Sequence, residues 1–429
     1  MVPAGWALYD FANTIFSFAV VSGAIGLWLT DAAQFGERDG NFLLSIGIVA
    51  SVGLNALVSP ALGALSDRAG RRLPFLFFFT ALCVVPTALI ASAGGVAGLL
   101  LFVVANFAYQ AALVYYDSTL AIVSYPATRG RLSGIGVAVG YLGTIAVGLL
   151  ITVLDVPVAA RFLLAAALYG VFAIPIFLVV RERGPTERVS LDDVRRSFAR
   201  VVETVRRGGE VPGLLRFLLA RFFYTDAVNT IIVVMSVVSV RAMGLSDSEA
   251  ILVLLSLTVV AIVASFGWGL LVDRLGPKRT LLVVLWSWII GLVAGAVSLG
   301  LNGTSVGLPL FLAAGAILGS GLGGVQVADR VFLMRLAPRE RLGEFFGLYG
   351  LVGKGSQVIG QLLYGFTILL FLDTLGVGAY QLAVLSLLGA VAVGLWLVRT
   401  VSDTPREAAS PVAPPERLSP GAAPLEPRA

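Results

Sequence analysis

The sequence predicts an all-α membrane protein whose twelve transmembrane helices form two pseudo-symmetric six-helix bundles. Apolar residues make up 58% of the 429 residues and charged residues only 13%, a balance that soluble domains do not have. The apolar residues gather in twelve runs, each close to the roughly 20 residues that cross a bilayer as a helix. The second half of the chain also repeats the polar pattern of the first half.

The twelve segments follow from dividing the chain at the breaks between these runs. They span residues 5–30, 42–65, 73–94, 97–124, 132–154, 160–180, 214–240, 249–272, 280–301, 306–334, 344–372 and 378–398. The domain organisation is then an N-terminal bundle over 1–180, a linker over 181–213, a C-terminal bundle over 214–398 and a tail over 399–429. The tail is rich in Pro, Ala, Glu and Arg and is expected to be disordered.

Charge and residue usage exclude other classes of protein. The net charge is +5, but the cations lie in short breaks between apolar runs, where they orient helices and do not form a nucleic-acid surface. Cys83 is the single cysteine and histidine is absent, so a disulfide and a cysteine-based metal site are excluded. We expect no cofactor, no metal and no enzymatic activity, and any proton chemistry is left to carboxylates or lysine.

The cations also predict the orientation of the helices. They cluster after segments two, four, eight and ten, at Arg68, Arg71, Arg72, Arg129, Arg131, Arg274, Lys278, Arg279, Arg335, Arg339 and Arg341. Because cytoplasmic loops carry an excess of Lys and Arg, both termini and the linker are expected in the cytoplasm of a multi-pass inner-membrane protein. The linker is either an amphipathic helix on the inner surface, with Val194, Phe198, Val201, Val202 and Val205 on its apolar face, or a solvated connection.

Three matches between the halves indicate a duplicated six-helix unit. Asp10 and Asn13 in segment one have the spacing of Asp226 and Asn229 in segment seven. Asp117 and Pro126 correspond to Asp329 and Pro338, because 329 minus 117 and 338 minus 126 both give 212. The loop at 63–72 matches the loop at 269–279. In transporters, such parallel repeats meet at a central cavity.

The chain resembles a known family at these motifs. The loop Gly63-Ala-Leu-Ser-Asp-Arg-Ala-Gly-Arg-Arg72 resembles the signature loop of the major facilitator superfamily, and 269–279 is its expected partner. The strings at 6–13, 130–143 and 344–354 resemble the vacuolar-effluxer-like branch, which in fungi is associated with release of amino acids from the vacuole. The resemblance implies a secondary transporter of the major facilitator fold, in which segments one, four, seven and ten line the cavity.

Charged residues inside the predicted segments are the candidate binding groups. Each aspartate at mid-bilayer costs roughly 2.5 to 3.5 kcal/mol on insertion scales, so Asp10, Asp117, Asp226 and Asp329 are expected to face protein or water. The predicted substrate or coupling-ion residues are Asp10, Asn13, Asp117, Asp226, Asn229, Asp329, Lys354 and Gln357. Helical spacing puts Asp10, Asn13 and Ser17 on one face, and Lys354, Gln357 and Gln361 on another. The alternative is a structural salt bridge, for Asp329 with Arg330 and for Lys354.

The two matching loops are predicted to act as gates. The gating residues are Gly63, Asp67, Arg68, Arg71, Arg72, Gly269, Asp273, Arg274, Lys278 and Arg279. The glycines would permit close approach of helices, the aspartates would cap or pair near a helix N-terminus, and the cations would hold phosphates or carboxylates. The alternative is a simple positive-inside anchor.

These groups favour an alternating-access carrier, expected to be monomeric, of a small polar solute. An amino acid or similar zwitterion is expected, because carboxylates and Lys354 around one cavity would meet both its ends, with a proton or sodium ion as coupling ion. Two alternatives stay open. Asp10-Phe11 also resembles helix one of sugar–cation symporters, and a non-transporting membrane sensor is the other class.

Overall fold

The computed structural model describes residues 2–69, 71–123, 129–182, 191–337 and 342–402. Every regular element in this part is a helix. The N-terminal bundle contains α1 (Val2–Ile15), η1 (Phe16–Ser22), α2 (Ile25–Leu29), α3 (Gly36–Ala69), α4 (Leu73–Ala93), α5 (Gly95–Val123), α6 (Arg129–Val153) and α7 (Val158–Val179). The C-terminal bundle contains α9 (Leu214–Val237), η2 (Val238–Ala242), α10 (Asp247–Leu275), α11 (Pro277–Gly300), α12 (Gly307–Leu336), α13 (Leu342–Gly355), α14 (Ile359–Leu375) and α15 (Val377–Thr400).

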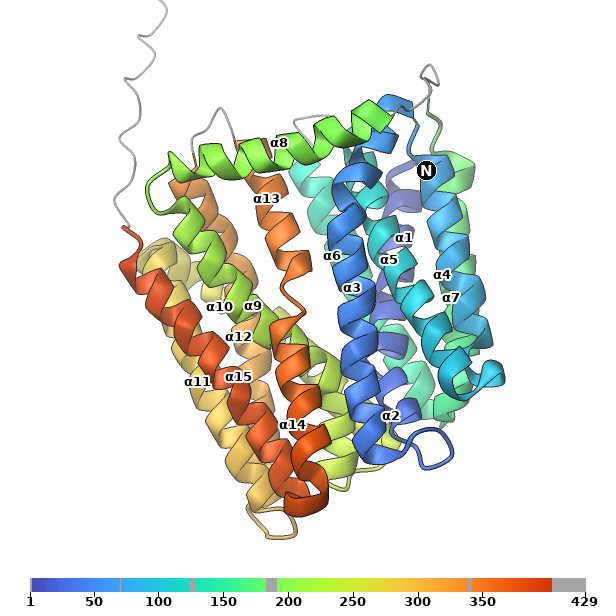
Figure 1. The fold of residues 1–429 in the computed structure, drawn as a ribbon, viewed down its shortest axis with the longest axis vertical. Coiled ribbons are helices and arrows are strands. Elements are labelled where there is room, and N and C mark those ends of the chain that lie inside the picture. The colour runs from blue at the N-terminus through green and yellow to red at the C-terminus, as the bar shows by residue number, and fades with distance from the viewer. Residues whose placement is uncertain (1, 70, 124–128, 183–190, 338–341, 403–429) are drawn as a thin grey trace, which may run out of the picture.

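These helices confirm the predicted class, twelve membrane segments in two six-helix bundles. In the described part, ten helical segments are long and apolar enough to cross a membrane, and 138–153 and 359–375 are shorter apolar helices in segments five and eleven. Segment one consists of α1, η1 and α2, segment seven of α9 and η2, and segment eleven of α13 and α14. The bundles stand side by side in Figure 1, and helix α8 (Leu191–Gly209) crosses their ends.

The two ends of the molecule differ in the elements that they carry. The α8 end carries the N-terminus, α8 and the end of α15, and the opposite end carries the turns that connect α2 to α3 and α14 to α15. Of the predicted tail, residues from 403 onward lie outside the described part.

Both bundles begin with a helix that widens into a π-helix, which the sequence pattern does not reveal. The π-helical stretches are η1 in the first segment and η2 in the seventh. Arg161, at the start of α7, is only 1% exposed and donates from Nη1 to the carbonyl of Gly23, just after η1, over 2.9 Å. Its Nε donates to the carbonyl of Val156 over 3.0 Å. Sequence reasoning overlooked this buried cation because it lies at a segment end.

Helices of the two bundles approach closely at glycines. A Cβ atom built on Gly26 of α2 would lie 2.5 Å from Val237 Cγ2 of α9. A Cβ on Gly365 of α14 would lie 2.6 Å from Ser45 Cβ of α3. Close approach was also predicted at Gly269, and there the prediction is wrong, because a Cβ on Gly269 would meet nothing within 4 Å.

Candidate functional site

Two aspartates of the N-terminal bundle lie close together and are open to the surface. Asp10 of α1 is half-buried and Asp117 of α5 is exposed. Their carboxylates are near enough to repel each other. Asp10 also faces α6, since a Cβ built on Gly140 would lie 3.0 Å from Asp10 Oδ2. The pair therefore forms an acidic surface on the N-terminal bundle, which suits a cation or an ammonium group.

Asn13 does not join this acidic surface. Its side chain is 1% exposed and its Oδ1 accepts a hydrogen bond from the hydroxyl of Tyr169 of α7 over 2.9 Å. Ser17 lies in η1, where the α-helical spacing no longer holds, and bonds to Tyr109 of α5. The prediction that Asp10, Asn13 and Ser17 form one polar face is therefore wrong, because Asn13 points into its own bundle.

A cation of the C-terminal bundle lies near Tyr141 of the N-terminal bundle. Arg330 of α12 is exposed. Tyr141 of α6 lies within electrostatic reach of both Arg330 and Asp10. Sequence reasoning considered Arg330 only as a partner of its neighbour Asp329. The structure instead brings Arg330 near Tyr141 of the other bundle, which also lies near Asp10.

Asp329 is held in a buried cluster by a different arginine. It is 0% exposed and forms an ion pair with Arg221 of α9, not with Arg330. Its carboxylate also accepts hydrogen bonds from the hydroxyls of Tyr349 over 2.7 Å and Tyr224 over 3.5 Å. The Arg221 guanidinium lies 3.6 Å from the centroid of the Tyr349 ring, a cation–π contact. Asp329 therefore forms a structural salt bridge, as the alternative prediction had it, but with Arg221 and not with Arg330. Solute binding by Asp329 stays a prediction.

Asp226 caps a break in segment eleven. Helix α13 ends at Gly355 and α14 begins at Ile359, so the first N–H groups of α14 have no partner in their own helix. Asp226 is 0% exposed, and its Oδ2 accepts the N–H of Gly360 over 2.6 Å. A carboxylate is favourable at a helix N-terminus. Its other oxygen, Oδ1, has no hydrogen-bond partner among the described residues.

The break also corrects the predicted polar face of segment eleven. Lys354 lies on α13 and Gln361 on α14, with Gln357 between the two helices, so the three do not follow one helical repeat. Gln361 is buried, and neither of its amide atoms has a partner in the described part. Asn229 donates to Ser356 Oγ at the break over 3.4 Å. The side chain of Lys354 lies outside the described residues.

The two repeats place the same residues against a glycine but leave them in different surroundings. Asp10 and Thr14 lie beside Gly140, and a Cβ built there would be 3.0 Å from Asp10 Oδ2. Asp226 and Thr230 lie beside Gly360, and a Cβ built there would be 3.1 Å from Asp226 Oδ2. In the continuous helix α6, Thr14 Oγ1 donates to the Gly140 carbonyl over 2.6 Å, and Asp10 stays half-buried. The broken helix instead engages Asp226 and buries it.

The first predicted gating loop is only partly described. The surroundings of Gly63 and the side chains of Asp67 and Arg68 lie outside the described part of the chain, and Arg71 is exposed. The backbone N–H groups of Arg72 and Leu73 donate to the Glu182 carboxylate over 2.8 and 2.9 Å, which caps α4. Arg72 Nη1 donates to the carbonyl of Ser118 of α5 over 2.9 Å. The capping carboxylate at this loop thus comes from the end of segment six.

The second predicted gating loop makes contacts other than those predicted. Asp273 lies in the last turn of α10 and not at a helix N-terminus, and it is exposed, as are Arg274 and Arg279. Lys278 Nζ donates to the carbonyls of Arg399 over 3.0 Å and Val401 over 2.6 Å, so it caps α15 and does not hold a carboxylate. The gating role of both loops stays a prediction.

A polar network joins the bundles at the opposite end. Tyr364 of α14 donates to Asn41 Oδ1 of α3 over 2.8 Å, and Tyr380 of α15 donates to Glu37 Oε1 of α3 over 2.8 Å. Arg38 of α3 pairs with Asp373 of α14 at 2.8 Å. These contacts, together with the Ser45–Gly365 approach, close the molecule at this end.

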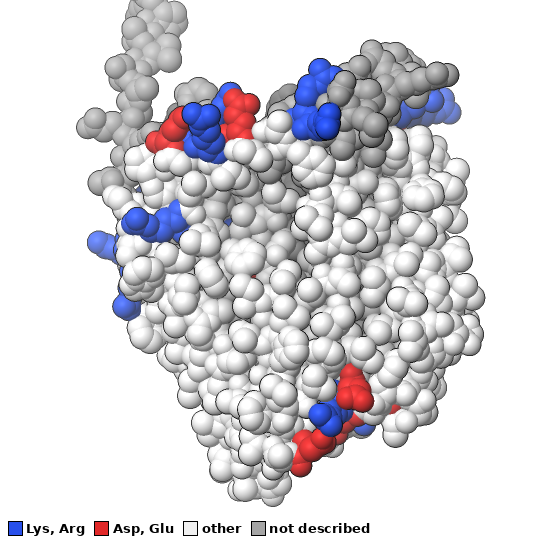
Figure 2. Space-filling view, viewed as in Figure 1, with Lys and Arg blue, Asp and Glu red and all other residues white. Residues whose placement is uncertain are grey.

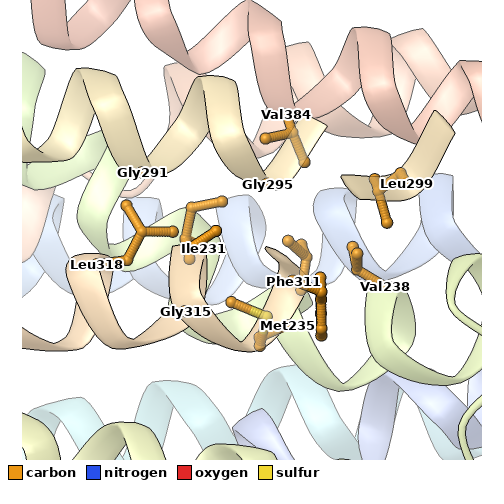
Figure 3. Close-up of a pocket in the computed structure, with 12 residues that line it drawn as sticks. Ile231, Met235, Val238, Gly291, Gly295, Leu299, Phe311, Gly315, Leu318 and Val384 are labelled. Carbon is orange, nitrogen blue, oxygen red and sulfur yellow. The ribbon is translucent and has the colours of Figure 1, made fainter. Parts of the chain in front are cut away.

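The cavity drawn in Figure 3 is a different kind of space. It lies inside the C-terminal bundle between α9, η2, α11, α12 and α15, and its lining consists of apolar side chains and glycines. About 20 Å³ is open to the centres of water-sized molecules, little more than one water needs. A second cavity, between η1 and helices α9 to α12, has about 110 Å³ and is also mainly apolar. Neither holds the charged groups described above.

The fold is the one that major facilitator transporters have. A mutant form of the nucleoside transporter NupG superposes with a TM-score of 0.71 at 14% identity, covering 93% of this chain and 99% of that one. A D-xylose-proton symporter superposes with a TM-score of 0.68 at 13% identity, covering 94% and 97%. At such low identity these likenesses show the fold alone.

The sequence comparisons place the chain within one branch of that class. The chain belongs to the vacuole effluxer Atg22-like family, whose model matches residues 41–407. It is 29% identical to the uncharacterized MFS-type transporter YxiO of Bacillus subtilis (strain 168), over 93% of this chain and 94% of the relative. Autophagy-related protein 22 of Yarrowia lipolytica is 27% identical over 55% of this chain, and the match spans 45% of that protein. These findings confirm the resemblance at the sequence motifs.

Proposed function

We propose that this membrane protein is a secondary transporter that carries a small solute bearing both a positive and a negative charge, such as an amino acid. The supporting observation is that Tyr141 of the N-terminal bundle lies within electrostatic reach of Arg330 on the other bundle and of Asp10, which neighbours Asp117. The ammonium group of such a solute fits the aspartates. Its carboxylate fits the guanidinium of Arg330, because a guanidinium can donate two parallel hydrogen bonds to a carboxylate. A solute held by both bundles couples its own binding to their relative movement.

The polar network at the opposite end supports an inward-open state. By the positive-inside bias, the α8 end faces the cytoplasm, so the network among Asn41, Tyr364 and Tyr380 would close the outer side. Opening toward the outside would break these bonds and bring the α8 ends of the bundles together. Movement is driven by a proton or sodium gradient, with Asp10 and Asp226 as the coupling carboxylates. The family's name favours efflux as the direction.

A sugar–cation symporter is the second candidate. The superposition on a D-xylose-proton symporter is consistent with such a role, although it concerns the fold only. Sugars carry no ammonium or carboxylate, so they would leave the opposed charges of Asp10 and Arg330 without a partner. The charge arrangement therefore favours the zwitterion.

Solute binding and flux distinguish the two candidates. We expect the purified chain to be stabilised in a thermal-shift screen by zwitterionic amino acids and not by neutral sugars, and the stabilising solute to cross proteoliposomes. Asp10→Asn and Arg330→Gln should each weaken that binding about tenfold or more, since each removes a hydrogen bond to a charged group. Asp39→Asn and Arg181→Gln change exposed charges outside this site and serve as matched controls. If the protein transported sugars and did not transport amino acids, the proposal of a zwitterionic solute would be refuted.

A further inference from the structure

Helix α8 carries an exposed apolar strip. Phe198, Val202 and Val205 recur at helical spacing, and they are 41%, 69% and 40% exposed. The helix is nevertheless fixed to both bundles, because it contacts α3 of the first and α9 and α13 of the second. A Cβ built on Gly208 would lie 3.0 Å from Leu215 and 3.7 Å from Phe345, so packing uses a neighbouring edge of the helix.

Two arginines border this strip. At 3.6 residues per turn, Arg195 and Arg206 project about 60° and 80° from Phe198, on the same side of the strip and three turns apart. Within the described part of the chain, neither makes a hydrogen bond or ion pair. Arg207 differs, since it projects about 180° from Phe198 and is paired with Glu203.

The position of the helix suggests what covers the strip. Figure 1 places α8 across the ends of the helices that are long and apolar enough to cross a membrane. Lipid headgroups begin where such helices leave the hydrocarbon core. Figure 2 shows charged side chains of both signs at the upper edge of the molecule, cations on the left side below it and a mixed cluster near the lower end, with a mostly uncharged surface between. A helix in this position inserts apolar residues among acyl chains while its arginines reach the headgroups. Glu203 and Glu210 also line the groove that holds Val202 and Arg206, but Glu203 is paired with Arg207. Arg195 and Arg206 project closest to the strip and are unpaired within the described part of the chain, so an anionic headgroup is the complementary one.

We infer that α8 is a docking surface for anionic phospholipids of the leaflet at the α8 end, whose phosphates bind Arg195 and Arg206. The strip of Phe198, Val202 and Val205 enters the acyl region. Because α8 contacts both bundles, lipids bound to α8 would hold the connection between the bundles at the α8 end. This inference concerns the linker surface and does not depend on which solute the cavity takes.

Spin labels on the full chain test the docking surface. In a Cys83→Ala background, a nitroxide is placed at Val202 or at Glu203, and the protein is reconstituted in phosphatidylcholine vesicles or in an equal mixture with phosphatidylglycerol. In the mixed vesicles the label at 202 should be accessible to oxygen and protected from a water-soluble nickel complex. The label at 203, which projects about 140° from Phe198, should show the reverse. Protection at 202 should decline in high salt, because salt screens headgroup contacts.

Matched arginine variants test the assignment of the headgroup contacts. Arg195→Gln with Arg206→Gln should raise the phosphatidylglycerol fraction needed for half-maximal protection at 202 at least twofold, or abolish protection in the equal mixture. Arg207→Gln removes the same charge from the far side of the helix and should leave that fraction unchanged. Equal protection in pure phosphatidylcholine, a water-exposed label in both vesicles, or an effect of Arg207→Gln as large as that of the double variant would each overturn the inference. These experiments do not measure transport, so they test lipid docking even if the proposed transport of a zwitterion is refuted.

Discussion

Asp329 and Arg221 show how strongly a single buried partner determines what a charge can do. Asp329 is fully buried, and its ion pair is surrounded by the hydroxyl and ring of Tyr349. Removing one partner of a buried ion pair typically costs about 3 to 5 kcal/mol, because the other charge stays desolvated. At the scale of residues, the pair is therefore a structural link between α9, α12 and α13 before it is a binding group.

We expect Asp329→Asn to lower the melting temperature of the detergent-solubilised protein clearly, since Arg221 would be left buried and unpaired. The double variant Arg221→Met/Asp329→Leu should regain most of that loss, because it removes both charges together. Asp273→Asn, at an exposed carboxylate, should leave the melting temperature unchanged. An unchanged melting temperature in Asp329→Asn, together with lost solute binding, would instead make Asp329 a solute-binding residue.

The sequence identified the aspartates as important but not their partners. Neighbouring residues on a helix do not face each other, so Arg330 could not close onto Asp329. Arg221 lies 108 residues before Asp329, and only the packing of α9 on α12 brings them together. Arg161 escaped notice for a related reason, because its partners are backbone carbonyls, which no side-chain pattern reveals.

At the scale of elements, segment eleven departs most from what the sequence predicts. Residues 353–361 contain no proline, and their apolar surroundings favour one continuous helix. The break instead depends on a distant residue, because Asp226 of α9 accepts the Gly360 N–H that a continuous helix would use internally. In the N-terminal repeat, Thr14 donates instead to the carbonyl of Gly140, and α6 is unbroken. Equal motifs in the two repeats thus produce different elements.

Gly360 should be sensitive to the smallest substitution. A Cβ there would lie 2.5 Å from Thr230 Oγ1 and 3.1 Å from Asp226 Oδ2, so Gly360→Ala must displace the cap. We expect a loss of stability on the order of 1 to 3 kcal/mol, as for overpacking a dense core, and reduced transport. Gly347→Ala in α13 is the matched control, because a Cβ there meets nothing within 4 Å. Equal melting temperatures for both variants would contradict this account of the break.

The cap also separates two possible roles of Asp226. In Asp226→Asn the amide oxygen can still accept the Gly360 N–H, so the break should persist while the titratable charge is lost. We therefore expect exchange of solute between compartments at equal pH to continue, and gradient-driven accumulation in proteoliposomes to disappear. Asp10→Asn should also abolish gradient-driven transport. Should both variants accumulate solute like the wild type under imposed proton and sodium gradients, neither carboxylate couples transport.

At the scale of the whole molecule, the sequence predicted the architecture well because lipid imposes it. Apolar length determined the twelve segments, with boundaries close to those observed, as for 160–180 against Val158–Val179. The relation between bundles could not be predicted in the same way. It depends on a few contacts, such as that of Gly26 with Val237. The sequence shows that Gly26 is small, but it does not show which residue packs against it.

Movement between the bundles can be arrested with a single covalent link. A Cβ on Gly355 of α13 would lie 3.9 Å from Ala56 Cβ of α3, a separation that suits a disulfide between the two bundles. A Cβ on Gly295 of α11 would also lie 3.9 Å from Ala314 Cβ of α12, but within one bundle. In a Cys83→Ala background, oxidising Ala56→Cys/Gly355→Cys should stop solute flux, and reduction should restore it. The control pair Gly295→Cys/Ala314→Cys should form its disulfide and keep transporting. Blocked thiol labelling would show that the inter-bundle disulfide has formed. If flux then continued unchanged, alternating access by rigid bundles would be refuted.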